Sequence, residues 1–111
     1  MRWRIVFDDA ETCKRFSDAL RQDGLSPSLM YGGQPIYMRP SLLNQATATP
    51  ESSPWTSPLY TGDARYDEGL CPASEDIMKR VLIVSSVNAR YTDRDVDEIV
   101  RIVRTTASKA L

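Results

Sequence analysis

The residues best suited to bind a small polar molecule flank a double glycine in the first half of the chain. Tyr31 precedes Gly32-Gly33, and Tyr37 and Arg39 follow it. Tyrosine hydroxyls can form hydrogen bonds with a hydroxyl group of a ligand, and the planar fork of arginine suits a carboxylate. We therefore take Tyr31, Tyr37 and Arg39 as candidate substrate-binding residues. The alternative is that both tyrosines pack with only a polar tip exposed, and that Arg39 is simply solvated.

Cys71 and Glu75 lie where a helix is predicted to begin. A thiol becomes reactive when its pKa is lowered, which a helix N-terminus can do. The sequence contains no histidine, however, and histidine is the commonest general base and the usual partner of a nucleophilic thiol. We predict a structural role for Cys71, and for Glu75 a reciprocal helix cap or an ion pair with an arginine. No catalytic residue is predicted in this chain.

The lysines bear on whether the chain can hold a carbonyl cofactor. Lys14, Lys79 and Lys109 are the only ones, and each lies on a predicted helix, toward its charged side or its end. A lysine that forms a Schiff base must be desolvated or lie beside another cation. We therefore expect surface lysines and no cofactor-binding residue. With two cysteines and no histidine, we also expect no metal site. Two free thiols are the default expectation, and a single disulfide is the alternative.

The overall composition is that of one small globular domain covering residues 1–111. The chain is 41% hydrophobic and 26% charged, with a formal net charge of −1. A nucleic-acid binder usually carries a basic stripe, so we expect no nucleic-acid partner. No apolar run approaches the roughly 18 residues of a membrane span, and no signal peptide follows Met1. We expect a cytoplasmic protein with no membrane contact.

The first third of the sequence predicts a strand and a helix. Apolar and basic residues alternate over residues 2–7, which is typical of a strand with one buried face. Because this strand begins almost at residue 1, we expect the chain to be cut from something longer. Asp8 and Glu11 suit a capping box, and the helix that follows should end at Gly24.

The middle third predicts a short strand and a long irregular segment. We expect a strand over residues 28–31, ended by the double glycine, and extended or turn conformation over residues 34–40 because of the prolines. Residues 44–67 are rich in Ser, Thr and Pro and predict a long irregular loop. Trp55 and Tyr60 within it indicate docking, either on the domain itself or on a partner.

The last third predicts a helix, a buried strand and a capped helix. Pro72 suits the first turn of a helix, and residues 81–84 form a continuous β-branched and leucine run. Thr92 and Asp95 suit the start of an amphipathic final helix. The predicted fold is α+β: a two-layer sandwich of a small three- to four-stranded antiparallel or mixed sheet with about three helices on one face.

These segments together resemble the C-terminal small domain of the DegT/DnrJ/EryC1/StrS aminotransferases, which are fold-type I enzymes that use pyridoxal phosphate. The resemblance covers nearly the whole chain in the right order. Its most specific step is Cys71-Pro72-Ala73-Ser74-Glu75, followed by the strand and the capped helix. The matching segments are Arg4-Ile5-Val6-Phe7-Asp8, Phe16-Ser17-Asp18-Ala19-Leu20 with Gly24, Gly33-Gln34-Pro35-Ile36-Tyr37 with Pro40, Gly69-Leu70-Cys71-Pro72-Ala73-Ser74-Glu75 and Tyr91-Thr92-Asp93.

The resemblance implies a function that this chain would share with a larger part. In such enzymes a large N-terminal domain holds pyridoxal phosphate, the small domain shapes the substrate side of the site, and the enzyme is a dimer. The complete enzyme would move an amino group from glutamate or glutamine to a keto sugar or cyclitol. The implied partner is thus the missing cofactor-binding domain or subunit, with Trp3, Trp55 and the loop aromatics as candidates for the docking patch.

Two hypotheses follow from different classes of protein. The first is a C-terminal domain or split half of such an aminotransferase, which predicts an exposed apolar patch for the large domain. The second is a free-standing, non-catalytic ligand-binding or regulatory module derived from that domain. It predicts no large apolar patch and a central loop that closes over the chain's own ligand or edge strand.

Overall fold

The computed structural model describes residues 2–46, 55, 57–86 and 88–111. Its helical and strand segments follow one another in an order close to the one predicted from the sequence. They are β1 (Arg2–Val6), α1 (Ala10–Gln22), β2 (Ser28–Leu29), the 3₁₀ turns η1 (Met30–Gly33) and η2 (Ile36–Met38), α2 (Pro40–Leu43), α3 (Pro72–Arg80), β3 (Val81–Ser86) and α4 (Asp93–Ala110).

The strands form one three-stranded antiparallel sheet in the order β1-β3-β2. Leu82 at the centre of β3 pairs with Ile5 on one side and Leu29 on the other. The pairing of β1 with β3 shifts between Trp3 and Arg4, where β3 carries one extra residue. The α+β prediction is confirmed, with three strands and an antiparallel sheet.

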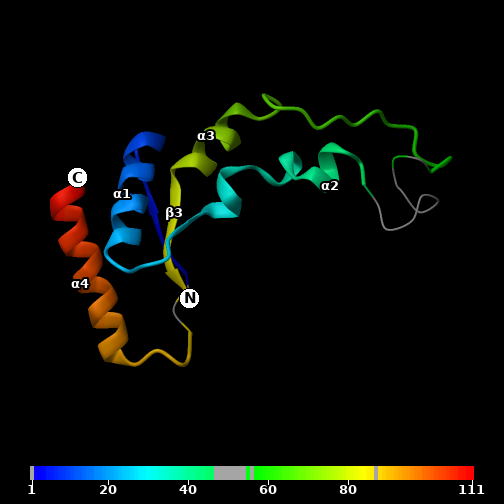
Figure 1. Ribbon diagram of the computed structural model, residues 1–111. Helices are drawn as coiled ribbons and strands as arrows, with labels where there is room; N and C mark the ends of the chain where they lie inside the picture. Colours follow the sequence, from blue (N-terminus) through cyan, green and yellow to red (C-terminus); the bar gives the residue numbers. More distant parts are fainter. Residues whose placement is uncertain (1, 47–54, 56, 87) are drawn as a thin grey trace.

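The hydrophobic core lies between this sheet and helices α1 and α4, which run side by side in Figure 1. Phe16 and Leu20 of α1, Leu82 of β3 and Val103 of α4 are all less than 9% exposed. Burying each such side chain contributes about 1.5–3 kcal/mol to folding. Trp3 and Ile5 pack against the core, as the alternation in the first strand predicts.

Two polar contacts hold the helices at their ends. The buried hydroxyl of Thr106 in α4 donates to the carboxylate of Asp23 just after α1, over 2.5 Å. Thr92 caps α4 in the predicted capping box: its Oγ1 accepts from the Asp95 amide, and Asp95 Oδ2 accepts from the Thr92 amide. These contacts fix where α4 begins and how it lies against α1.

The start of α1 corrects the sequence prediction by one residue. Asp9 is the N-cap, not Asp8, because Asp9 Oδ1 accepts from the amide of Thr12 over 2.7 Å. Asp9 has the extended backbone of a cap, and the helix begins at Ala10. The predicted end is confirmed, since Gly24 follows the helix with φ +93°.

The second strand is shorter than predicted. It ends at Leu29 because Tyr31 and Gly32 both take left-handed backbone angles, with φ values of 52° and 73°. Gly33 then passes so close to Leu29 that a Cβ there would lie 2.9 Å from Leu29 Cδ1. The double glycine therefore turns the chain sharply out of the sheet.

The described residues among 34–71, namely 34–46, 55 and 57–71, form a projection that we call the arm, and the remaining described residues we call the body. In Figure 1 the arm extends sideways from the sheet, carries α2, and returns to the start of α3. The molecule is accordingly elongated, with extents of 57 × 32 × 18 Å. Part of the predicted loop at 44–67, namely residues 47–54 and 56, lies outside the described residues. In the part of the chain that is described, no helix is long and apolar enough to cross a membrane.

Candidate functional site

The three candidate substrate-binding residues lie at the base of the arm but face different partners. Arg39 donates from Nη2 to the backbone carbonyl of Tyr31 over 2.9 Å. The Tyr31 side chain itself is exposed. Tyr37 turns away from this pair and contacts the start of α3. The structure therefore joins Tyr31 to Arg39 and places Tyr37 in a separate polar cluster.

That cluster, which we call the clasp, consists of Tyr37, Gly69, Cys71 and Glu75. The Tyr37 hydroxyl donates to Glu75 Oε1 over 2.5 Å and accepts from the Cys71 amide over 3.1 Å. The same Glu75 oxygen accepts from the Gly69 amide over 2.7 Å. The clasp thus joins the outgoing end of the arm to its returning end and to α3.

Local backbone geometry brings the clasp together. The η2 turn carries Tyr37 toward the body, and the turn before α3 uses Gly69 at φ +90°, in the left-handed region that favours glycine. Pro72 occupies the first turn of α3, where its missing N–H costs no hydrogen bond. Glu75 then reaches back over that first turn. The sequence predicts for Glu75 either a reciprocal helix cap or an ion pair with an arginine. Glu75 instead accepts hydrogen bonds from the Tyr37 hydroxyl and the Gly69 amide, and neither partner is an arginine.

The hydrogen bonds of the clasp set the protonation of its two side chains. The Tyr37 hydroxyl, followed by the amides of Gly69 and Cys71, lowers the pKa of Glu75 below its ordinary value. Desolvation, followed by the neighbouring Glu75 carboxylate, raises the pKa of Tyr37. At neutral pH the pair is an ionised carboxylate and a neutral phenol. Both are held in the state that keeps the hydrogen bond, so the pair serves to fix the arm.

The two cysteines are free thiols in opposite surroundings. Cys13 is buried in the core, and desolvation raises its pKa. Cys71 is exposed at the N-cap of α3, with Sγ 3.2 Å from the Ser74 hydroxyl. That hydroxyl and then the Ser74 amide lower the pKa of Cys71. A serine hydroxyl is not a base, so the contact explains a stabilised thiolate but provides no proton acceptor for nucleophilic catalysis.

The lysines lie where the sequence predicts, on the exposed faces of helices. The Lys14 side chain is 81% exposed and forms an ion pair with Asp18 over 3.7 Å. Lys79 and Lys109 are exposed on α3 and α4. None of the three is desolvated in the way a Schiff-base lysine requires. Among the described residues, no three His, Cys, Asp or Glu side chains are grouped to hold a metal ion.

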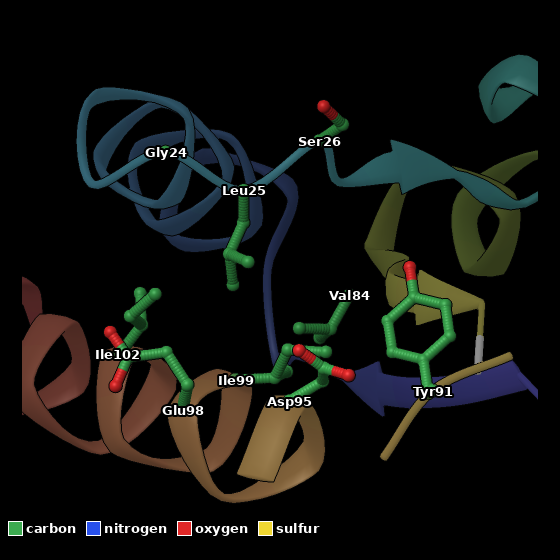
Figure 2. A pocket seen from close by; sticks show the side chains of 9 residues that line it. All are labelled: Gly24, Leu25, Ser26, Val84, Tyr91, Asp95, Glu98, Ile99 and Ile102. Carbon is green, nitrogen blue, oxygen red and sulfur yellow. The ribbon is translucent and has the colours of Figure 1, made fainter.

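A second feature was not predicted from the sequence: a hollow of about 530 Å³ in the body, lined by no residue of the arm. It lies between the chain that follows α1, the end of β3 and the first turns of α4 (Figure 2). No local sequence motif predicts the hollow, because it forms only when three segments far apart in the sequence pack together.

Comparisons with known proteins return nothing. No protein-family description, no curated protein and no solved structure matches the chain.

Proposed function

We propose that this chain is the C-terminal small domain, or a separately encoded half, of a DegT/DnrJ/EryC1/StrS-type aminotransferase that acts on a keto sugar or cyclitol. In this proposal the chain works in the cytoplasm, as part of a dimer, beside a larger part that holds pyridoxal phosphate. The support from sequence is the ordered set of motifs that runs through nearly the whole chain. The support from structure is the arm.

The arm carries large apolar side chains outward, and this observation carries the proposal. Ile36, Leu43, Leu59 and Leu70 are all exposed, and Leu59 is 90% exposed. None of the described arm residues belongs to the hydrophobic core cluster. Large contiguous apolar patches on a protein surface mark contacts with other proteins, and in the proposal these side chains contribute to such a patch. Burying one such leucine stabilises a complex by up to about 1.5–3 kcal/mol before binding costs are subtracted.

The aromatic candidates for the docking patch divide between body and arm. Trp3 is half-buried against the core and is not part of an exposed patch. Trp55 lies in the arm and meets the Tyr66 ring edge-on, with ring centres 6.3 Å apart. In the proposal the docking surface is therefore the arm, and the sheet residue Trp3 is left out of it.

The chain's own residues do not fit the cofactor. Each lysine is an exposed helix residue, so none meets the requirement for a Schiff base at neutral pH. We accordingly assign the amino-transfer chemistry, and the cofactor that would supply it, to the larger part. This chain would contribute Tyr31 and Arg39 to the substrate side. Within the described residues Arg39 uses Nη2 for the Tyr31 carbonyl, which leaves the other edge of its guanidinium for a carboxylate.

The test mixes the chain with pyridoxal phosphate, alone and with a cofactor-loaded large domain that lacks its own small domain. We expect no Schiff-base absorbance band from the chain alone, and a shift of the large domain's band when the chain is added. Leu59→Asp and Leu70→Asp should weaken that association by about tenfold or more, since each places a charge in an apolar contact. Leu111→Asp is the control, because Leu111 lies outside the arm and is 65% exposed. It should leave the association with the large domain unchanged.

Two results would contradict the proposal. A Schiff-base band from the chain alone would mean that one of its lysines is competent after all. Absence of association with the large domain, with the arm leucines replaceable at no cost, would favour the free-standing ligand-binding or regulatory module instead.

A further inference from the structure

The hollow beside α4 has the size of a small-molecule site. Its volume of about 530 Å³ falls within the roughly 300–1,000 Å³ of typical ligand pockets. Leu25, Val84, Ile99 and Ile102 give it an apolar floor, and Val84 and Ile99 are themselves core residues. Figure 2 shows Leu25 pointing from the chain after α1 toward α4, so that the floor is formed from both sides.

The charge of the lining is of one sign. Among the described residues around the hollow, the charged side chains are two carboxylates, Asp95 and Glu98, and none is basic. The two differ in what they do. Arg101 binds both Glu98 oxygens, over 2.8 and 2.6 Å, and so neutralises that carboxylate. In Figure 2 the Glu98 side chain also runs away from Asp95, toward Ile102.

Asp95 faces the hollow, and one of its carboxylate oxygens, Oδ1, takes no part in the helix cap. Its hydrogen bonds with the amide and hydroxyl of Thr92 both use Oδ2. Those bonds, the hydroxyl first, lower the pKa of Asp95, so the group is ionised at neutral pH. Figure 2 places the carboxylate between Ile99 and the ring of Tyr91, at the opening. Oδ1 is therefore positioned to accept a hydrogen bond from a molecule in the hollow.

Tyr91 completes the site with an aromatic wall. It stands at the opening opposite α4 and is 39% exposed. An ammonium group beside an aromatic face is attracted by the ring as well as by a carboxylate. An apolar floor, one ionised acceptor and an aromatic wall are complementary to a molecule with an apolar body and a positive end.

We propose that this hollow binds a small organic ammonium ion, with its apolar body on Leu25, Ile99 and Ile102 and its ammonium group on Asp95 and Tyr91. The proposal is independent of the aminotransferase assignment, because the hollow contains no arm residue. It also assigns Asp95 two tasks: one oxygen caps α4, and the other receives the ligand.

A charge series on the unmodified protein tests the proposal without any substitution. Phenethylammonium, 2-phenylethanol and phenylacetate share a benzyl body and differ in charge at the end. We expect phenethylammonium to shift the amide NMR signals of Leu25, Ser26 and Ile99, the neutral alcohol to bind about tenfold more weakly, and the anion not to bind. A charge-assisted hydrogen bond is stronger than a neutral one by enough to account for a factor of that size.

Two variants then separate the carboxylate from the cap. Asp95→Asn retains an oxygen that can accept from Thr92 but loses the charge, so it should bind phenethylammonium no better than the alcohol. Thr92→Ala removes the cap hydroxyl and keeps the carboxylate, so it should retain most of the affinity even if α4 is weakened. Equal binding of the alcohol and the ammonium ion, unchanged affinity in Asp95→Asn, or signal shifts confined to other regions would each overturn the proposal.

Discussion

The body has a buried hydrophobic core, whereas no described residue of the arm belongs to that core and several large apolar side chains of the arm are exposed. In the body, Phe16 on α1 is 1% exposed and packs against Phe7 with ring centres 5.6 Å apart. In the arm, Leu59 is 90% exposed. The body is therefore stabilised by its own core, whereas the arm is held mostly by polar contacts and offers its apolar surface outward. The contrast indicates that the hydrophobic core that stabilises the fold lies in the body and does not extend into the arm.

Among the described residues of the arm the contacts are mostly polar, although the Trp55 and Tyr66 rings also meet. Gln45 Nε2 donates to the carbonyl of Ala64 over 3.2 Å, which links the outgoing and returning halves. The amide of Ala64 donates to the Tyr60 hydroxyl over 3.0 Å. Together with the clasp at the base, these bonds give the arm a shape without giving it a core.

The largest expected effect tests the difference in burial directly. Phe16→Ala should lower the free energy of unfolding by about 3–5 kcal/mol, because it removes a buried ring and leaves a cavity. Leu59→Ala should change it by no more than about 0.5 kcal/mol, because that side chain is already in water. Urea unfolding followed by circular dichroism measures both. Similar changes in the free energy of unfolding for the two variants would contradict the difference in burial between body and arm.

A smaller, local effect is expected from the clasp. Tyr37→Phe removes the acceptor of the Cys71 amide, and Glu75→Ala removes the acceptor of the Gly69 amide. Each variant should speed hydrogen exchange several-fold, first at the amide that lost its partner, while the exchange of body amides in β3 is unchanged. Tyr31→Phe is the matched control. It also removes a tyrosine hydroxyl, but it keeps the backbone carbonyl of Tyr31 to which Arg39 donates. Faster exchange throughout the body would show that the clasp and the core unfold together.

The smallest effect is the pH dependence of the same contact. The pKa of Glu75 is lowered in the folded state, so its contribution is present above its ordinary value of about 4.3 and is lost as the pH falls through the lowered value. The pKa of Tyr37 is raised, so its contribution is present below about pH 10 and is lost as the pH rises through the raised value. The amide signal of Gly69, which donates to Glu75, should therefore stay constant between about pH 5 and 10 and change outside that window. A change centred near neutral pH would contradict this assignment.

The sequence predicted the body well because its signals are local. The alternation in residues 2–7, the buried run at 81–84 and the capping box at Thr92 each involve residues a few positions apart. The error at the start of α1 has the same origin, because Asp8 and Asp9 are both good caps and only the fold selects Asp9. The shortened second strand reflects a left-handed Tyr31, which few sequences would predict for a tyrosine.

The site was predicted less well because its contacts are distant in sequence. Tyr37 and Glu75 are 38 positions apart, and no periodic pattern relates them. The sequence identified both residues as notable and could not pair them. The hollow beside α4 is lined by residues from segments 24–26, 84 and 91–102. These segments are far apart in the sequence, so no local pattern predicts that they meet.

The clasp also determines how the chain tolerates changes in length. Tyr37 and Glu75 join the two ends of the arm at its base, and Gln45 and Ala64 join its two halves further out. The chain between Gln45 and Ala64 is therefore a loop whose ends are already held together. The entropy of closing such a loop rises only slowly, by roughly 0.6 kcal/mol for each doubling of its length. A peptide inserted between Gln45 and Ala64 should therefore leave the register of β1, β2 and β3 unaltered.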